Sequence, residues 1–381
     1  MNINFTLWST SPSGGYKVIF ELANGLVERG HQVTITALGG DHSWFPLKAE
    51  VNYIKPPWPI KLLSPLLRII LKRPARYYEI LTLTQKMKMG FEPDLVKALA
   101  DNTPTCDVNI ATWFPTASAV YRSGEGVPVN LCQDFDQLAK ERGLYFNRMF
   151  KESLYLPLNL ITISGWLKDW LKEEYDKDSE IIALGIDHDI FYPRENEKDD
   201  GYLKIMGIFR GLYYKGDNDL IEALKIVAEE YENLKLVAVG KKEVLDDLLG
   251  EKDLNFEFES HNWLSDDEMA LLYSSSDIFA FPSHIEGFGL PPLEAMACET
   301  PVVTTDCLGV RDYIIPNENA IIIPPKDPKT LAQSIIDLAS NESLKEKFKK
   351  NGLITARDYN WDNAVDVFEK ALIKFVKEDK K

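Results

Sequence analysis

Apolar and polar positions near the start of the chain follow the order strand, turn, helix, strand. Residues 3–8, with the sequence INFTLW, give the first strand signal. Over residues 17–30, apolar side chains recur every three or four positions, which predicts an amphipathic helix that ends at Gly30. Residues 31–38 predict a second strand. This strand–helix–strand order predicts a parallel sheet.

The same alternation continues through the first half of the chain and then breaks. Strands are predicted at 105–113, 127–134 and 159–166, and a helix at 167–175, whereas residues 44–100 are less regular. Residues 185–203 are polar, charged and marked by Gly and Pro, which predicts an interdomain linker.

After this segment the alternation starts again. Two tandem Rossmann-like halves are therefore predicted, without a short-period repeat. The second half contains predicted strands at 204–209, 234–240, 277–283, 301–306 and 319–325, and predicted helices at 219–231, 266–276, 292–299 and beyond 329.

The composition of the chain indicates its number of domains and argues against one class of partner. The chain has 381 residues, which suggests two domains, and 45% hydrophobic residues, which is enough for sizeable cores. Its net charge of −16 argues against nucleic acid as a partner, because phosphate backbones recruit basic surfaces.

The cysteines and the N-terminus indicate a cytoplasmic protein. The four cysteines form no CxxC pair, so reduced thiols are a simpler interpretation than a zinc site. The N-terminus has no signal-peptide pattern, and no segment has the run of about 20 apolar residues that a bilayer span requires.

Two glutamates, Glu286 and Glu294, flank a Gly-Phe-Gly-Leu-Pro-Pro turn between a predicted strand and a predicted helix. Free N–H groups at a helix start attract anions, and glycine lets a phosphate approach the backbone closely. The carboxylates would repel phosphate, so we expect them to bind sugar hydroxyls. The alternative is an ordinary strand–turn–helix with glycines for a sharp turn.

These residues carry a family resemblance. Residues 282–303 resemble the E-x7-E signature of retaining glycosyltransferases of family GT4, whose GT-B fold has two Rossmann-like domains facing each other across a cleft. Four further stretches resemble family segments in the right order, and together they span most of the chain: 13–35, 183–193, 207–216 and 359–372.

The resemblance implies a role for each matching position. Glu286 would hold the hexose of a nucleotide-sugar, and Glu294 the ribose hydroxyls. Arg210 and Lys215 would bind the diphosphate. The remaining donor-binding positions implied by the family are Gly14, Gly15, Gly287, Phe288, Gly289 and Leu290.

Arg210 and Lys215 also suit this role on physical grounds. They follow the predicted strand 204–209, and ligands of parallel sheets gather where strands end. Fixed cations there stabilise the charge that develops on a departing diphosphate. The alternative is two solvated surface charges.

The family reaction needs no protein nucleophile, metal or cofactor other than the donor substrate. The acceptor enters on the face that the diphosphate leaves, so the donor anomer is retained. The acidic pairs Asp199-Asp200 and Asp266-Asp267 are read as a linker and a helix start, and not as a metal site.

Several positions depart from the family pattern. Gln133 and Asp134 stand where many relatives carry a histidine; Asp134 is either a base or acceptor ligand, or a helix cap. His284 is read as structural. Glu299 stands where relatives usually have glycine, and no role follows for it.

Residues 58–78 are apolar and basic within an acidic chain. They suit peripheral contact with an anionic membrane carrying a lipid-linked acceptor, or an ordinary amphipathic helix with its lysines reaching to solvent.

Together, the residue patterns and the family resemblance predict a two-domain hexosyltransferase. Residues 1–187 are expected to bind a glycan or lipid-linked acceptor, and 188–358 a nucleotide-sugar carrying glucose, mannose, rhamnose or a similar hexose. The closing helix, 359–381, is expected to return to the first domain. The alternatives are a sugar-nucleotide epimerase or phosphorylase and a non-catalytic nucleotide-sugar-binding protein; an oxidoreductase lacks its GxGxxG spacing.

Overall fold

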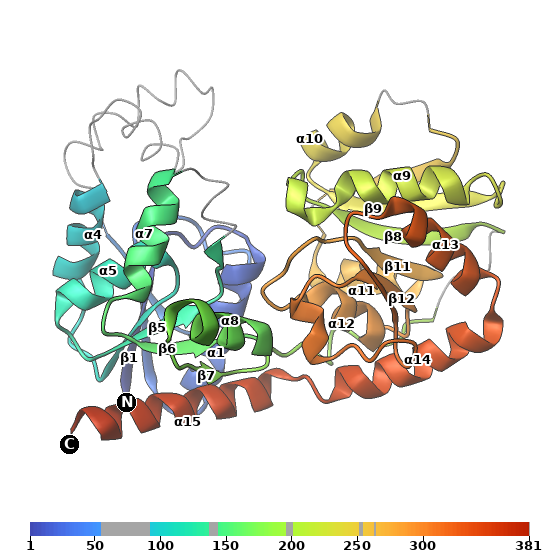
Figure 1. The fold of residues 1–381 in the computed structure, drawn as a ribbon. Coiled ribbons are helices and arrows are strands. Elements are labelled where there is room, and N and C mark those ends of the chain that lie inside the picture. The colour runs from blue at the N-terminus through green and yellow to red at the C-terminus, as the bar shows by residue number, and fades with distance from the viewer. Residues whose placement is uncertain (55–91, 137–143, 196–200, 251–253, 263, 381) are drawn as a thin grey trace. The chain divides into compact units, whose positions relative to one another are not determined.

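The computed structural model describes residues 1–54, 92–136, 144–195, 201–250, 254–262 and 264–380 (Figure 1). The chain forms two compact units. The first unit comprises Met1–Ile163, Leu167–Ile182 and Ala364–Lys381, and the second comprises Ser164–Trp166 and Ala183–Asn363. The basic segment 58–78 lies outside the described residues.

The first unit is built on a parallel sheet of seven strands in the order β3-β2-β1-β4-β5-β6-β7. Its helices in the described part of the chain begin with α1, Gly14–Glu28, which Ser13 caps through its hydroxyl. The strands are β1 Asn2–Leu7, β2 Gln32–Ala37, β3 Glu50–Tyr53, β4 Val108–Ala111, β5 Val127–Cys132, β6 Asn159–Thr162 and β7 Glu180–Ile181. The other helices are α4 Glu92–Asp101, α5 Phe114–Ser123, α7 Leu144–Leu154, α8 Gly165–Tyr175 and α15 Trp361–Asp379.

Helix α15 comes from the far end of the sequence and packs on the first unit. Phe368 is fully buried, and its ring lies 6.2 Å from that of Phe5 in β1. Gly25 of α1 lies so close to Val365 that any larger residue would overlap the valine side chain. The first unit is therefore discontinuous in sequence.

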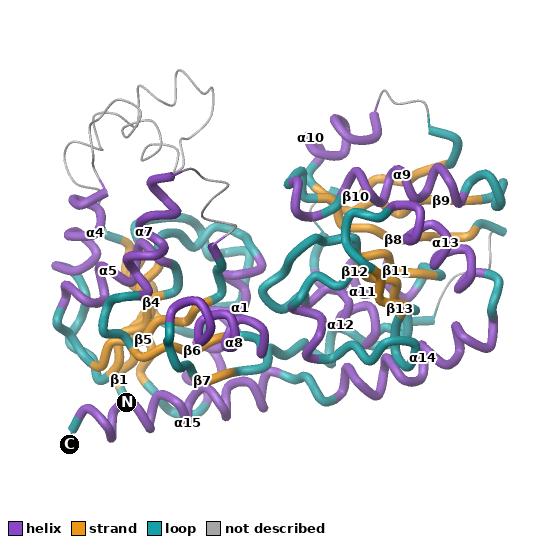
Figure 2. The backbone as a smooth tube through the Cα atoms, viewed as in Figure 1, coloured by secondary structure: helices purple, strands orange, loops and turns teal. Residues whose placement is uncertain are grey.

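The second unit contains a six-stranded parallel sheet in the order β10-β9-β8-β11-β12-β13 (Figure 2). The chain runs outward from β8 through β9 to β10 and then returns to β11 on the other side of β8, so the strand order reverses there. The strands are β8 Leu203–Phe209, β9 Leu234–Gly240, β10 Glu257–His261, β11 Ile278–Phe281, β12 Val302–Thr305 and β13 Ile321–Ile323. The helices are α9 Asp217–Val227, α10 Lys242–Leu245, α11 Asp266–Ser274, α12 Leu290–Ala297, α13 Pro328–Ala339 and α14 Glu342–Arg357, with short turns η1 Tyr213–Lys215, η2 Asp246–Gly250 and η3 Gly309–Asp312.

Ligands of open parallel sheets bind at such a reversal, beyond the carboxyl ends of the two strands concerned. In this unit these are the ends of β8 and β11, which carry the segments with Arg210, Lys215 and Glu286.

The predicted linker needs correction over residues 185–195, because this segment packs as part of the second unit. Ile186 and Phe191 are buried; Ile186 forms a β-bridge with Asn360, and the Phe191 ring contacts that of Tyr273. Polar contacts add to these apolar ones: His188 Nε2 pairs with Tyr359 O at 3.1 Å, and Arg194 N donates to Ser274 Oγ at 3.1 Å.

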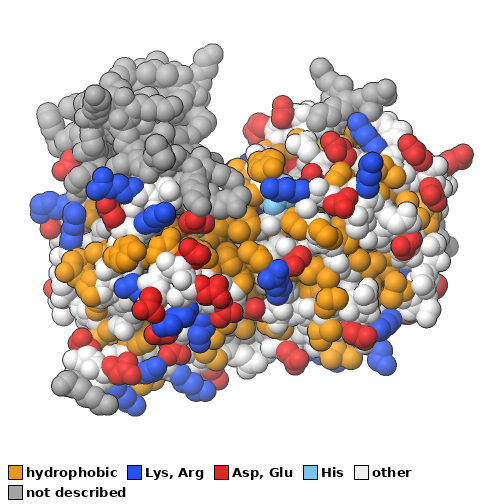
Figure 3. All heavy atoms as spheres, in the orientation of Figure 1, with side chains coloured by type: hydrophobic (Ala, Val, Ile, Leu, Met, Phe, Trp, Pro, Cys, Tyr) orange, Lys and Arg blue, Asp and Glu red, His pale blue; other side chains and the backbone are white. Residues whose placement is uncertain are grey.

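Charged side chains of both signs are interspersed on the face shown in Figure 3. Among the helices that the structure describes, none combines the length and the apolar character needed to cross a bilayer.

Candidate functional site

The turns after β8 and β11 touch each other. Gly216 ends the first turn with a φ of 70°, and a Cβ atom there would overlap the carbonyl of Pro282, the residue after β11. Only glycine meets both conditions without strain. This close approach brings the predicted diphosphate segment against the predicted sugar-binding loop.

Lys215 and Glu286 form an ion pair across these turns. The Lys215 Nζ atom donates to both carboxylate oxygens of Glu286, at 2.7 and 2.9 Å. Their side chains are 23% and 13% exposed, so the pair is partly screened from water and still reachable by a ligand. The structure thus brings together two residues 71 positions apart that sequence reasoning had assigned to one site.

Asp217 shapes the turn that carries the cations. Its buried carboxylate accepts hydrogen bonds from the backbone N–H groups of Arg210, at 3.0 Å, and Gly211, at 2.6 Å. Burial raises the pKa of this carboxyl above its usual range, while the two backbone N–H groups pull it down. The Arg210 side chain itself is exposed.

The Glu286 loop rests on a tight turn after β12. Cys307 O accepts from Glu286 N at 2.8 Å and from Gly309 N at 2.9 Å. The intervening Leu308 has φ 69° and ψ −58°, which is the strained γ-turn conformation. Strained backbone that neighbouring contacts hold in place is frequent at functional sites.

Two donors from elsewhere in the second unit fix the glycine loop itself. Trp166 Nε1 donates to Gly287 O at 3.0 Å, and the Tyr313 hydroxyl donates to Gly289 O. Gly289 has φ 85°, and α12 begins at Leu290, directly before two prolines. Phe288, between the glycines, is buried. Hydrogen bonds to the carbonyl oxygens of Gly287 and Gly289 therefore hold the loop in place.

Glu294 lies on α12, and its Oε2 accepts a hydrogen bond of 3.0 Å from the Tyr273 hydroxyl. Tyr273 is fully buried, and burial together with the Glu294 charge raises the pKa of its phenol well above the usual value. Sequence reasoning found Glu294 but missed Tyr273, because a tyrosine in a helical stretch reads as core.

The His284 side chain is only 5% exposed and lies beside the same turns. Its Nε2 pairs with Asp219 Oδ2 at 2.6 Å, and its backbone N donates to Tyr214 O at 2.7 Å. These contacts tie α9 and the preceding turn η1 to the loop after β11. Sequence reasoning missed Asp219 as its partner.

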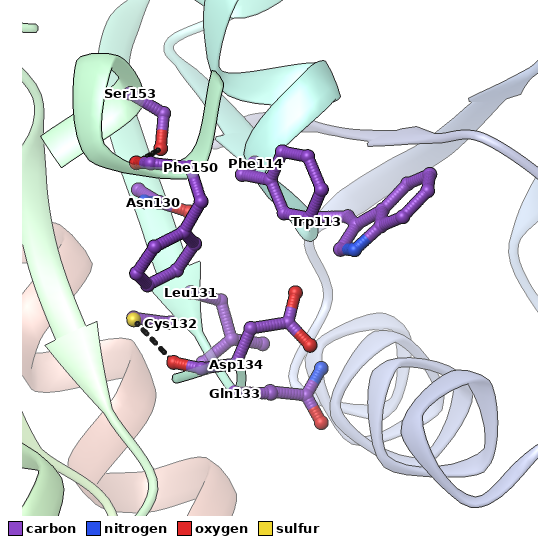
Figure 4. Close-up of a pocket in the computed structure, with 9 residues that line it drawn as sticks. All are labelled: Trp113, Phe114, Asn130, Leu131, Cys132, Gln133, Asp134, Phe150 and Ser153. Carbon is purple, nitrogen blue, oxygen red and sulfur yellow. Dashed lines mark hydrogen bonds between the residues drawn. The ribbon is translucent and has the colours of Figure 1, made fainter. Parts of the chain in front are cut away.

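The candidate residues of the first unit lie directly after β5 and at the start of α1. Gln133 Nε2 donates to Gly15 O at 3.5 Å, whereas nothing lies within 4 Å of a Cβ built on Gly14. Asp134 lines a small pocket in which its carboxylate points toward Trp113 (Figure 4). The pocket lining is Trp113, Phe114, Asn130, Leu131, Cys132, Gln133, Asp134, Phe150 and Ser153.

Cys132 in this pocket is a poor nucleophile. Burial raises the pKa of its thiol to about 12, so it stays protonated at neutral pH. Within the described ranges, no three His, Cys, Asp or Glu side chains gather closely enough to hold a metal ion.

Comparison with solved structures identifies the class of fold. Sucrose-phosphate synthase from Thermosynechococcus elongatus superposes with a TM-score of 0.75 at 16% identity, over 99% of this chain and 100% of that one. The protein therefore has the GT-B fold, as the sequence predicted.

Sequence comparison matches part of the chain to a known family. Residues 189–354 match the family model for glycosyl transferases group 1. The capsular polysaccharide biosynthesis glycosyltransferase CapM of Staphylococcus aureus is 29% identical over 54% of this chain, and the chain spans only 58% of CapM. An uncharacterized glycosyltransferase of Methanocaldococcus jannaschii, MJ1607, is 25% identical over 95% of both chains. Residues 189–354 are therefore similar in sequence to the group 1 glycosyl transferases.

Proposed function

We propose that this protein is a retaining glycosyltransferase. It moves a hexose such as glucose, mannose or rhamnose from a nucleotide-sugar to a glycan or lipid-linked acceptor, in the synthesis of a cell-surface polysaccharide or glycoconjugate. The observation that carries the proposal is the Lys215–Glu286 pair at the ends of adjacent parallel strands.

A sugar diphosphate needs both charges of this pair. Its hydroxyls donate to a carboxylate, and its phosphate oxygens accept from an ammonium group. Lys215 contacts Glu286 directly, so in this assignment the sugar and the diphosphate are bound side by side at the bond that breaks. Arg210, in the same turn, adds a second cation for the phosphates.

The proposed reaction exchanges one bond at the anomeric carbon. The bond to the diphosphate oxygen breaks while the acceptor oxygen bonds to the same face of the sugar. The acceptor's proton passes to the departing diphosphate. Lys215 and Arg210 stabilise the negative charge that develops on the leaving group, which lowers the barrier more than it stabilises bound donor.

The other candidate residues complete this assignment. Glu294 binds the ribose hydroxyls, and the backbone of Gly287–Leu290 contacts the sugar or diphosphate. In the first unit, Gly14 and Gly15 approach the donor phosphates and the acceptor, and Asp134 is a base or an acceptor ligand. The name of CapM, a capsular polysaccharide enzyme, supports a glycan or lipid-linked acceptor.

The first experiment identifies the donor. Thermal-shift measurements with UDP-, GDP- and dTDP-sugars should raise the melting temperature with one nucleotide class, because ligand that binds only the folded form stabilises it. Release of the nucleoside diphosphate then reports turnover, and NMR of the product reports its anomer.

Variants test the ion pair directly. Lys215→Ala and Glu286→Gln should each lower kcat at least about 100-fold, equivalent to roughly 3 kcal/mol of barrier. Lys242→Ala removes a lysine from an exposed ion pair with Asp246 and serves as the matched control. Unchanged turnover in both site variants contradicts the proposal, and donor converted to its epimer without acceptor identifies an epimerase.

A further inference from the structure

The contact between Tyr273 and Glu294 joins two helices of the second unit at the predicted ribose site. Tyr273 is the second-to-last residue of α11, and Glu294 lies on α12, 21 positions later. Neither the family model nor the names of the relatives assign Tyr273 a role.

Tyr273 is held rigidly. Its ring meets that of Phe279 in β11 edge to face, with centroids 5.1 Å apart, and also contacts Phe191. Its backbone carbonyl accepts a 2.6 Å hydrogen bond from Thr300 Oγ1, just beyond α12. The phenol hydroxyl consequently has a fixed position relative to α12.

The direction of the hydrogen bond is fixed as well. A buried phenol next to a carboxylate stays protonated, because ionising it would place two negative charges together. Tyr273 is thus the donor and Glu294 Oε2 the acceptor. This bond makes the two carboxylate oxygens inequivalent and restricts rotation of the Glu294 side chain.

We propose that Tyr273 is a positioning residue for nucleoside recognition: it orients the Glu294 carboxylate so that this carboxylate discriminates between donors with and without ribose hydroxyls. The inference rests on the proposed function, since it requires a nucleoside diphosphate in the site. Tyr273 acts only through Glu294 and does not touch the nucleotide.

The test measures discrimination, which packing alone does not change. Calorimetric titration compares UDP with 2′-deoxy-UDP and 3′-deoxy-UDP, and GDP with its corresponding deoxy forms, using the class that stabilises the wild-type protein. Losing a hydrogen bond to a charged group should weaken wild-type binding about tenfold or more for at least one deoxy form. In Tyr273→Phe, this ratio should fall below about threefold, with weakened binding of the ribonucleotide.

Tyr202→Phe provides a matched control. Tyr202 donates a 2.9 Å hydrogen bond to Glu257 near the amino ends of β8 and β10, at the opposite edge of the sheet from the site. This variant should keep the wild-type ratio. The double variant Tyr273→Phe/Glu294→Gln should have the same ratio as Glu294→Gln alone, because both changes disable the same contact.

The outcomes separate the two ideas. A wild-type ratio retained in Tyr273→Phe overturns this inference and leaves the proposed function standing, as does an equal loss of the ratio in Tyr202→Phe. If the wild-type protein binds no nucleoside diphosphate, the proposed function fails and the inference fails with it.

Discussion

Glu299 ends α12 in a backbone conformation that glycine adopts most readily. Its φ is 58°, and its N–H donates to Met296 O while the N–H of Thr300 donates to Ala295 O. This is the Schellman arrangement, in which the left-handed position is usually glycine. The structure therefore explains why a glutamate was unexpected there, and it assigns the side chain no contact that compensates for the conformation.

Replacing Glu299 with glycine should stabilise the protein. The gain should be about 0.5–1 kcal/mol in the free energy of unfolding, because glycine adopts this conformation without steric cost. Urea denaturation measures it. Glu299→Ala removes the charge and keeps the strain, so equal stability of the Gly and Ala variants would contradict the argument.

The buried carboxyl of Asp217 makes the stability of the protein depend on pH. Its pKa is raised in the folded state by burial, so its contribution to stability is present below the usual Asp pKa of 3.8 and is lost as pH rises through the raised value. Asp217→Asn cannot ionise and can still accept from Arg210 N and Gly211 N. Its free energy of unfolding, relative to wild type, should therefore rise as pH increases above 3.8.

Urea denaturation across a pH series measures this difference. The same substitution at exposed Asp337 serves as the control for a surface carboxylate. If the free energy of unfolding of Asp217→Asn minus that of wild type stays constant or falls as pH increases, the prediction is wrong. The two backbone hydrogen bonds then outweigh burial in setting the pKa of Asp217.

At this scale the sequence predicted residues but not their partners. Lys215 and Glu286 could be assigned to one site because each follows a parallel strand, and such strands end at one edge of the sheet. Tyr273, Trp166 and Asp219 could not be found, because their contacts depend on how separate elements pack. The catalytic and binding roles themselves stay predictions until the variants are measured.

At the scale of elements, helices α1 and α15 pack against each other at Gly25. Gly25 lies in mid-helix, where alanine would normally be favoured by about 1 kcal/mol. Val365 occupies the space that an alanine methyl group would need, and both residues are buried. The close packing of the two helices explains why glycine is present.

Gly25→Ala should destabilise the protein by roughly 1–3 kcal/mol in spite of its better helix propensity, because the added methyl group overpacks the contact. The double variant Gly25→Ala/Val365→Ala should be more stable than the sum of the single variants by about 1 kcal/mol. Urea denaturation of the four proteins gives this coupling, and strict additivity would show that the methyl group fits elsewhere.

The hydrophobic pattern predicted which segments form helices and which form strands, but it did not predict where these elements begin and end. The strand predicted at 277–283 is observed as β11, Ile278–Phe281, because Pro282 has no N–H for the sheet. The helix predicted at 219–231 starts two residues earlier and ends at Val227. Residues 185–195 look like a linker by composition, although Ile186 and Phe191 anchor them in the second unit.

For the whole molecule, pattern and resemblance together predicted the GT-B fold, which is confirmed. They also predicted a glycosyltransferase, and residues 189–354 match the family model for glycosyl transferases group 1. Alternating strands and helices determine a parallel sheet almost completely, whereas sugar and acceptor specificity depend on a few side-chain positions that no pattern encodes. The nucleotide class and acceptor therefore need the binding experiments above.

The discontinuous first unit leads to a prediction at this scale. A fragment of residues 1–182 lacks α15 and leaves the surface around Phe5 uncovered. It should lose cooperative thermal unfolding, and residues 361–381 fused to it through a flexible linker should restore a single transition. A fragment of 1–182 that unfolds cooperatively without α15 would contradict this, as measured by circular dichroism.

Helix α15 also sets the order of events during biosynthesis. The ribosome must make all of Ala183–Asn363 before the segment that closes the first unit emerges. At about 5–20 residues per second, roughly 180 residues take on the order of 10–40 s. During that interval we expect the nascent sheet to expose the apolar face that α15 later covers. This exposed surface makes the chain a substrate for chaperones that bind nascent proteins.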